Sequence, residues 1–171
     1  MLLERMIIRD ETPLDIDVIT EITAAAFADC PYGNHTEQFI IHALRAAGAL
    51  TVSLAAEIDG RVVGHIAISA VTIGGQVCDW YGVGPVSVRP DCQRQGIGKS
   101  LIEAGLRRLK ESGAKGCVLV GDPGYYKQFG FRNLPELILE GVPPENFLAL
   151  PFGGETARGV VVFHEGFGAT E

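Results

Sequence analysis

The stretch from Val86 to Ser100 places the strongest constraint on how this chain can fold. A β-branched run ends at Arg89-Pro90, glycines follow at positions 96 and 98, and apolar side chains recur at helical spacing from Leu101 onward. This order predicts a strand, a glycine-containing turn and a helix. Glycine lets a backbone approach a ligand closely, and the first N–H groups of a helix are unpaired and partly positive. The turn is therefore a candidate site for an anion such as a pyrophosphate.

Two common phosphate-binding motifs do not fit this turn. A Walker A loop requires G-x-x-x-x-G-K-[ST]; Gly98-Lys99-Ser100 supplies its ending, but Gln93 stands where the first glycine belongs. A dinucleotide-binding fingerprint requires G-x-G-x-x-G/A, and its third small residue would fall on Leu101. The pattern that remains is Gln93-x-x-Gly96-x-Gly98.

That remaining pattern resembles the Q/R-x-x-G-x-G/A pyrophosphate loop of the GNAT superfamily of acyl-CoA-dependent N-acetyltransferases. A second motif, Tyr126-x-x-x-Gly130-Phe131, is similar to an element that follows the fifth strand in these enzymes. The two motifs are separated by one predicted helix and one predicted strand. The order of elements from Thr51 to Phe131 also matches the superfamily core, whereas the chain before Thr51 fits it only loosely.

The resemblance implies an α/β fold with a mixed sheet that is mostly antiparallel, splayed between two parallel strands and flanked by helices. Residues 1–171 are expected to form one N-acetyltransferase domain, with the core motifs in 51–131 and further strands and loops in 132–171. Turn signals and hydrophobic periodicity predict strands at 6–9, 51–58, 61–73, 77–88, 117–120, 137–139, 147–150 and 160–163. Helices are expected at 12–27, 39–47, 97–113 and just before Gly130, with a break at 31–34 between the first two.

The same resemblance implies acetyl-CoA as the cosubstrate and no metal. The CoA pyrophosphate would bind backbone N–H groups from Arg94 to Lys99, with Gln93 bracing the loop, and the pantetheine arm would pair with Val86–Val88 like an added strand. A bulge at 82–85 would open the sheet there. The expected cofactor-binding residues are Val86, Ser87, Val88, Gln93, Arg94, Gln95, Gly96, Ile97, Gly98, Lys99 and Ser100.

Tyr126 matches the tyrosine that the superfamily uses as a general acid, so it is the candidate proton donor to the departing CoA thiolate. The alternative is a packing tyrosine whose hydroxyl bonds to the backbone. The general base is less determined. Glu37 is the first candidate because it borders the loop between the two front helices, a region that often lines the acceptor site in this superfamily. The other candidates are Asp79, Glu57, His65 and His35. Trp80 and Tyr81 allow two interpretations, an acceptor pocket or simple packing, and packing is the usual role of aromatic rings at strand ends.

Composition and charge limit which classes of partner and which cellular compartment are expected. The net charge of −7 disfavours binding to a phosphate backbone, so no nucleic-acid partner is expected. Glu4, Arg5 and Arg9 stand where a secretory signal needs an apolar core, and no apolar run approaches the ~18 residues of a membrane span. A cytoplasmic protein without membrane association is therefore expected. The four cysteines form no C-x-x-C pair, so neither a zinc site nor a redox pair is expected.

The leading hypothesis is an N-acetyltransferase that transfers the acetyl group of acetyl-CoA to a primary amine by direct attack in a ternary complex. The acceptor, a small molecule or a peptide, is not indicated by the sequence. One alternative is a non-catalytic acyl-CoA sensor on the same fold. A second, motivated by Gly98-Lys99-Ser100, is a P-loop nucleotide-binding protein. The oligomeric state is open, and a homodimer is compatible with the sequence.

Overall fold

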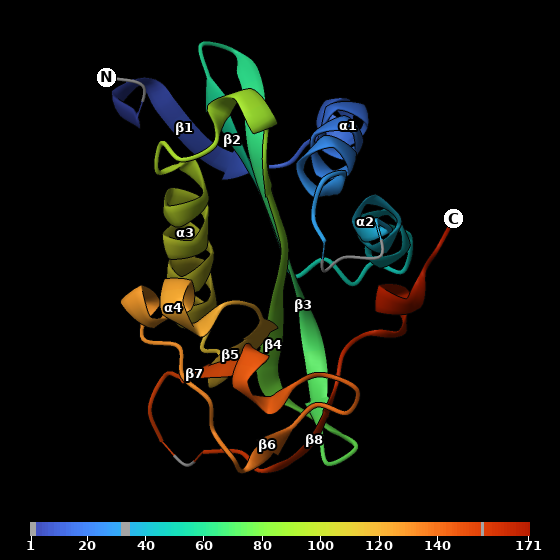
Figure 1. The fold of residues 1–171 in the computed structure, drawn as a ribbon, viewed down its shortest axis with the longest axis vertical. Coiled ribbons are helices and arrows are strands. Elements are labelled where there is room, and N and C mark those ends of the chain that lie inside the picture. Colours follow the sequence, from blue (N-terminus) through green and yellow to red (C-terminus); the bar gives the residue numbers. More distant parts are fainter. Residues whose placement is uncertain (1–2, 32–34, 155) are drawn as a thin grey trace.

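The computed structural model describes residues 3–31, 35–154 and 156–171, so positions 32–34 of the expected break lie outside the described residues. A mixed sheet is covered by α1 and α2 on one face and by α3 and α4 on the other (Figure 1). The elements are β1 Met6–Asp10, α1 Ile16–Phe27, α2 Glu37–Ala46, β2 Val52–Ile58, β3 Arg61–Ile73, β4 Gln76–Val88, α3 Ile97–Glu111, β5 Gly116–Val120, α4 Pro123–Tyr126, β6 Leu137–Ile138, β7 Phe147–Pro151 and β8 Gly159–Val162.

The strand order in the sheet is β1-β2-β3-β4-β5-β7. Every neighbouring pair in this path is antiparallel except β4 and β5, which are parallel because the crossover helix α3 connects them. The predicted fold class is therefore confirmed. β8 adds to the distal end of β3 and also pairs in parallel with β6. Periodicity predicted β6 and β8 as strands but did not identify these partners.

Helix α3 fits the sheet through the apolar stripe that its sequence predicts. The buried positions of the stripe are Leu101, Ile102, Gly105, Leu106 and Leu109. At Gly105 a Cβ would lie 3.0 Å from Ile68 Cδ1, so the missing side chain allows helix and sheet to approach closely. The charged residues on the opposite face of α3, Lys99, Glu103, Arg107 and Glu111, are all exposed, as expected for a solvated row.

On the other face of the sheet, a polar cluster connects α2 to the end of β1 and to strands β2 and β3. Arg45 of α2 forms an ion pair with Glu11 at 2.8 Å, and Glu11 also accepts a hydrogen bond from Ser53. His65 is fully buried, and its Nε2 lies 2.8 Å from Ser53 Oγ. The Nδ1 atom of His65 has no hydrogen-bond partner among the described residues. A neutral imidazole that donates from Nε2 to Ser53, which in turn donates to Glu11, satisfies the observed bonds.

This cluster predicts that the protein loses stability as the pH falls below about 6.5. Burial lowers the pKa of His65, so the unfolded chain binds a proton there, near its usual pKa of about 6.5, before the folded protein does. The free energy of unfolding should fall by up to about 1 kcal/mol between pH 6.5 and 5.5. Burial opposes ionisation of Glu11, but hydrogen bonds from His65, Arg45 and Ser53 hold its pKa well below the usual range. Protonation of Glu11 therefore adds a second loss of stability below about pH 4.3.

Urea unfolding at several pH values measures both losses of stability. A His65→Gln variant should lack the first, and equal slopes in the two proteins would contradict the assignment.

The sheet opens beside the second half of β4. The pairing of β4 with β5 runs from Trp80 opposite Gly116 to Gly82 opposite Val118. On its other side, Val83 and Val86 of β4 face Ile68 and Ile66 of β3, so three steps of β4 match two of β3. This is the bulge expected at residues 82–85, and Gly84 within it has a φ of 129°. Since β5 ends at Val120 and turns into α4, residues 83–88 of β4 border a split in the sheet.

Among the described residues, no helix combines the length and apolar character that crossing a membrane requires.

Candidate active site

The loop between β4 and α3 has the geometry expected of an anion-binding turn. A short 3₁₀ turn, Pro90–Cys92, follows β4, and Gly96 caps α3 in the left-handed region with a φ of 89°. The amide Nε2 of Gln93 donates a hydrogen bond of 3.1 Å to the carbonyl oxygen of Val88. Gln93 thus ties the loop to the end of β4. The first N–H groups of α3, as in any helix, have no partners within the helix.

A groove of about 240 Å³ lies between this loop, the end of β4 and α4. We call it the donor groove. It is lined by Ala26, Phe27, Val86, Ser87, Val88, Gln93, Gly98, Ile102, Tyr125 and Tyr126. Five of the expected cofactor-binding residues are therefore brought together with the expected catalytic tyrosine.

The remaining expected cofactor-binding residues have other surroundings. The side chain of Ile97 is 1% exposed and packs in the core, so only its backbone can face a ligand. Arg94 and Gln95 are exposed, and Lys99 and Ser100 line other grooves beside α3. Ser87 lines the donor groove but is 2% exposed, and its hydroxyl lies 3.2 Å from Thr23 Oγ1 of α1.

A second cavity of about 440 Å³ lies next to the donor groove. We call it the side cavity. Phe27, Val86 and Tyr126 line both spaces, so they lie where the two meet. The other lining residues of the side cavity are Glu37, Ile40, Val83, Gly84, Pro85, Val120, Leu139, Glu140, Val142, Phe163 and Phe167. The split in the sheet thus has a space on each side of one tyrosine.

Tyr126 is held by the short helix α4 and by neighbouring aromatic rings. Asp122 caps α4 by accepting a hydrogen bond of 2.9 Å from the N–H of Gly124. The ring of Tyr126 meets that of Tyr125 edge-on, with centroids 4.9 Å apart, and that of Phe131 at 5.9 Å. Burial, with a smaller contribution from Tyr125, raises the pKa of Tyr126 to about 12. Its hydroxyl makes no hydrogen bond within the described part of the chain. The alternative role, a packing tyrosine whose hydroxyl bonds to the backbone, would require such a hydrogen bond.

Gly121 provides the space for the Tyr126 ring, a role that the sequence did not indicate. A Cβ at Gly121 would lie 2.8 Å from Cδ2 of Tyr126 and closer still to Cε2. The ring edge is rigid, so a methyl group there must displace it. If Tyr126 is the proton donor that the resemblance implies, Gly121→Ala should lower kcat at least about fivefold, because a displaced ring loses its alignment with the reacting atoms. Steady-state acetyl transfer measures this. Gly168→Ala, whose Cβ meets nothing within 4 Å, is the control, and equal activity in both variants would contradict the role.

Of the five candidates for the general base, Glu37 lines the side cavity. One carboxylate oxygen of Glu37, Oε2, is buried and has no hydrogen-bond partner among the described residues. The other candidates are occupied or lie elsewhere: Glu57 pairs with Arg9 at 3.1 Å, and His65 is enclosed in the polar cluster. His35 lies 3.1 Å from the carbonyl of Cys30, and Asp79 lies near the opposite end of β4.

For Trp80 and Tyr81, the structure agrees with packing and not with an acceptor pocket. Trp80 is 1% exposed and packs in a core cluster with Val71 and Val118. A Cβ at Gly116 would lie 2.6 Å from its ring. Tyr81 packs against the main core and lines neither the donor groove nor the side cavity. Both rings therefore pack in the core, at the part of β4 that is still paired with β5. Aromatic residues on strands commonly pack in this way.

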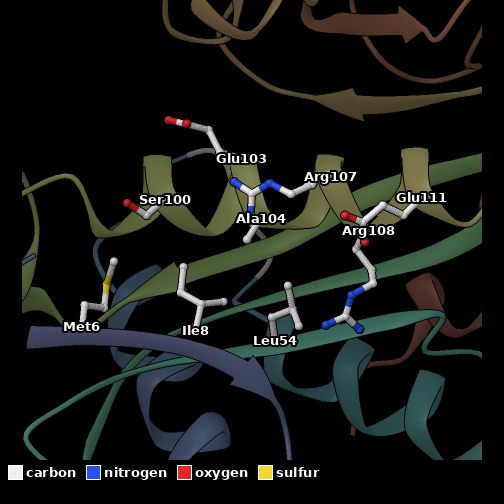
Figure 2. A pocket seen from close by; sticks show the side chains of 9 residues that line it. All are labelled: Met6, Ile8, Leu54, Ser100, Glu103, Ala104, Arg107, Arg108 and Glu111. Atoms are coloured by element: carbon white, nitrogen blue, oxygen red, sulfur yellow. The ribbon is translucent and has the colours of Figure 1, made fainter. Parts of the chain in front are cut away.

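A further groove, of about 480 Å³, lies between α3 and the strands β1 and β2 (Figure 2). Met6, Ile8 and Leu54 form its floor on the strands, and charged residues of α3 form its rim. Arg108 on the rim pairs with Asp10 at 2.9 Å. Ser100 is the one expected site residue that lines this groove, which is separate from the donor groove.

Cys30, Cys78, Cys92 and Cys117 are free thiols. Within residues 3–31, 35–154 and 156–171, no cluster of three or more His, Cys, Asp or Glu side chains could hold a metal ion.

Comparison with known proteins assigns the class. The family model described as the acetyltransferase (GNAT) domain matches residues 8–133, and the chain belongs to this family of N-acetyltransferases. The uncharacterized N-acetyltransferase YhbS of Escherichia coli K12 is 35% identical over 128 residues, which cover 74% of each protein. The crystal structure of a GNAT family acetyltransferase from Brucella melitensis in complex with acetyl-CoA is 49% identical, with a TM-score of 0.85 over 95% of this chain and 97% of that chain. The structure of YhbS with CoA is 30% identical, with a TM-score of 0.87 over 98% and 94% of the two chains.

Proposed function

We propose that this protein transfers the acetyl group of acetyl-CoA to a primary amine by direct attack in a ternary complex. The observation that carries the proposal is the meeting of the donor groove and the side cavity at Tyr126, Val86 and Phe27. A thioester lying along the donor groove can there be reached by an amine from the side cavity. The similar proteins of Brucella melitensis and Escherichia coli, solved with acetyl-CoA and CoA, support this choice of donor.

The residues of the donor groove fit CoA. The N-terminus of α3 offers unpaired N–H groups to a pyrophosphate, and the position of a Cβ at Gly98 has only Val88 Cγ2 nearby, at 3.7 Å. Space for a phosphate therefore remains above Gly98. Beyond the last pair with β5, the edge of β4 at Val86–Val88 can hydrogen-bond to the amide groups of the pantetheine arm. The bulge at Gly84 breaks the regular ladder and leaves main-chain groups available near the thioester.

The proposed reaction balances with two protein groups. The acceptor ammonium first loses a proton to the carboxylate of Glu37, directly or through water, and its nitrogen lone pair attacks the thioester carbonyl carbon. The resulting tetrahedral intermediate collapses as the C–S bond breaks, and the sulfur takes the proton of the Tyr126 hydroxyl. The nitrogen releases a second proton, so one of the two protons regenerates Tyr126 and the other reaches solvent. The products are the acetylated amine, CoA thiol and one proton.

The pKa of Tyr126 suits a proton donor. At a value of about 12 its phenol is protonated throughout the physiological range. The thiol of CoA in water has a pKa near 8.5, as for cysteine, but the burial that raises the pKa of the phenol acts in the same direction on a thiolate formed beside it. A donated hydrogen bond to the developing thiolate therefore lowers the barrier.

The test is release of CoA thiol from acetyl-CoA across a panel of amines, with calorimetry of CoA and of ATP with Mg²⁺. Amine-dependent thiol release is the expected result. Tight CoA binding without thiol release would identify a sensor and overturn the proposed activity. Tight binding of ATP with Mg²⁺ and no response to acetyl-CoA would instead favour a P-loop function.

A further inference from the structure

The walls of the side cavity are mainly apolar. Phe27, Ile40 and Val83 contribute from one side, and Leu139, Val142, Phe163 and Phe167 contribute from the C-terminal part of the chain. Among the described lining residues, Glu37, Glu140 and Tyr126 are the ionisable ones, and no lysine, arginine or histidine is present. A ligand that binds here therefore meets apolar surface and carboxylates, with no cationic side chain.

An aromatic wall is fixed in place by packing. Phe163 and Phe167 meet edge-on with centroids 5.0 Å apart. Phe163 covers Gly82 so closely that a Cβ at Gly82 would lie 2.9 Å from its Cε2. This rigid wall can bind an apolar or aromatic group without losing much side-chain entropy. The wall and Glu140 lie beyond residues 8–133, so they are contributed by a part of the chain outside the matched acetyltransferase domain.

The two glutamates differ in position. Glu37 is half-buried, and its buried Oε2 lacks a partner among the described residues. Glu140 is exposed and lines the cavity from the segment after β6. A buried carboxylate oxygen without a hydrogen bond is costly, and an incoming ammonium group can supply the missing donor. A carboxylate on the acceptor would instead meet like charge from Glu37 and Glu140 without a compensating cation.

From these observations we infer that the acceptor is a compact primary amine with an apolar or aromatic body and no carboxylate. The inference rests on the proposed acetyl transfer and specifies its substrate class. The ammonium docks at Glu37, the body lies against Phe163 and Phe167, and Glu140 disfavours acceptors that carry a negative charge. The volume of about 440 Å³ lies within the range of about 300–1,000 Å³ of small-molecule sites and suits one such molecule.

The experiment compares phenethylamine with phenylalanine, which differ only in the carboxylate, under saturating acetyl-CoA. We expect kcat/KM for phenethylamine to exceed that for phenylalanine at least about a hundredfold, since the carboxylate of phenylalanine would meet two glutamates and no compensating cation among the described lining residues. Hexylamine tests an aliphatic body, and spermidine tests a polycation. Phenylalanine or spermidine acetylated as well as phenethylamine would overturn the substrate class but leave the acetyl-transfer function standing. No thiol release with any amine would overturn both.

Variants at Glu140 test its part in the selection. Glu140→Lys should reduce the ratio of phenethylamine to phenylalanine at least about tenfold, because it replaces the repelling charge with an attracting one. Glu145→Gln removes an exposed glutamate that does not line the side cavity and should leave the ratio unchanged. An unchanged ratio in Glu140→Lys, in a variant that still unfolds at the wild-type urea midpoint, would remove Glu140 from the selection.

Discussion

Replacing Tyr126 with phenylalanine is expected to lower kcat at least about tenfold, because the substitution removes the hydroxyl that we propose as proton donor to the CoA sulfur and keeps the ring. The CoA affinity should stay near the wild-type value. The ring, not the hydroxyl, packs against Tyr125, Phe129 and Phe131, and the hydroxyl makes no hydrogen bond within the described residues. Folding stability should therefore change little. Steady-state thiol release and calorimetric titration with CoA measure the two quantities.

The neighbouring tyrosine supplies a matched control for this loss. Tyr125 also lines the donor groove and contacts Tyr126, but it is 40% exposed and does not line the side cavity. Tyr125→Phe removes the same atom one residue away, and kcat should stay within about twofold of the wild-type value, since no proton transfer depends on it. Equal kcat values for Tyr126→Phe and wild type would remove Tyr126 from the mechanism, whatever the Tyr125 result.

Local sequence signals were sufficient for most of the fold. The glycines at 96 and 130 lie at the start of α3 and after the turn that follows α4, where the sequence predicted a turn and a helix end. The alternating and helical patterns predicted β1 to β5 and α1 to α3, and the parallel pairing of β4 with β5 followed from a helix joining them. These features depend on residues close in the chain, which is why a single sequence reveals them.

The side cavity could not be predicted in the same way. It combines Phe27 of α1 and Glu37 of α2 with Glu140 and Phe163 from the C-terminal segment. Its walls depend on the pairing of β8 with β3 and β6, which joins distant parts of the chain. No periodicity within β8 indicates that partner. The choice between packing and a pocket at Trp80 needed the structure for a related reason: alternation along β4 does not show which of its side chains lie beside the split in the sheet.

Glu37 illustrates where sequence and structure complement each other. The resemblance ranked it first because it borders the loop between the two front helices. The structure places it in the side cavity with a buried oxygen that has no hydrogen-bond partner among the described residues. His65, by contrast, has the residue type of a base, but its ring is enclosed among Ser53, Glu11 and the sheet. Residue type alone does not separate these cases, because access to the substrate is a property of the fold.

The second large effect is expected at Gly98, which lies in the first turn of α3 and lines the donor groove. Gly98→Val should weaken CoA binding at least about tenfold, which corresponds to about 1.4 kcal/mol, because its side chain occupies the space through which a phosphate approaches the helix. Calorimetric titration with CoA measures the change. The Cβ itself fits the free protein, since its nearest contact would be Val88 Cγ2 at 3.7 Å, so the urea midpoint should remain close to wild type.

Two other substitutions make the Gly98 result interpretable. Ala104→Val adds bulk to the same helix at a residue that lines the groove of Figure 2 and not the donor groove, so it should leave CoA affinity unchanged. Gly96→Ala forces a side chain into a left-handed conformation at a φ of 89° and should cost about 1–2 kcal/mol of folding stability as well as affinity. Loss of affinity without loss of stability is therefore specific to position 98. Wild-type affinity in Gly98→Val would mean that the pyrophosphate does not bind at the start of α3, and the donor groove would then need another ligand.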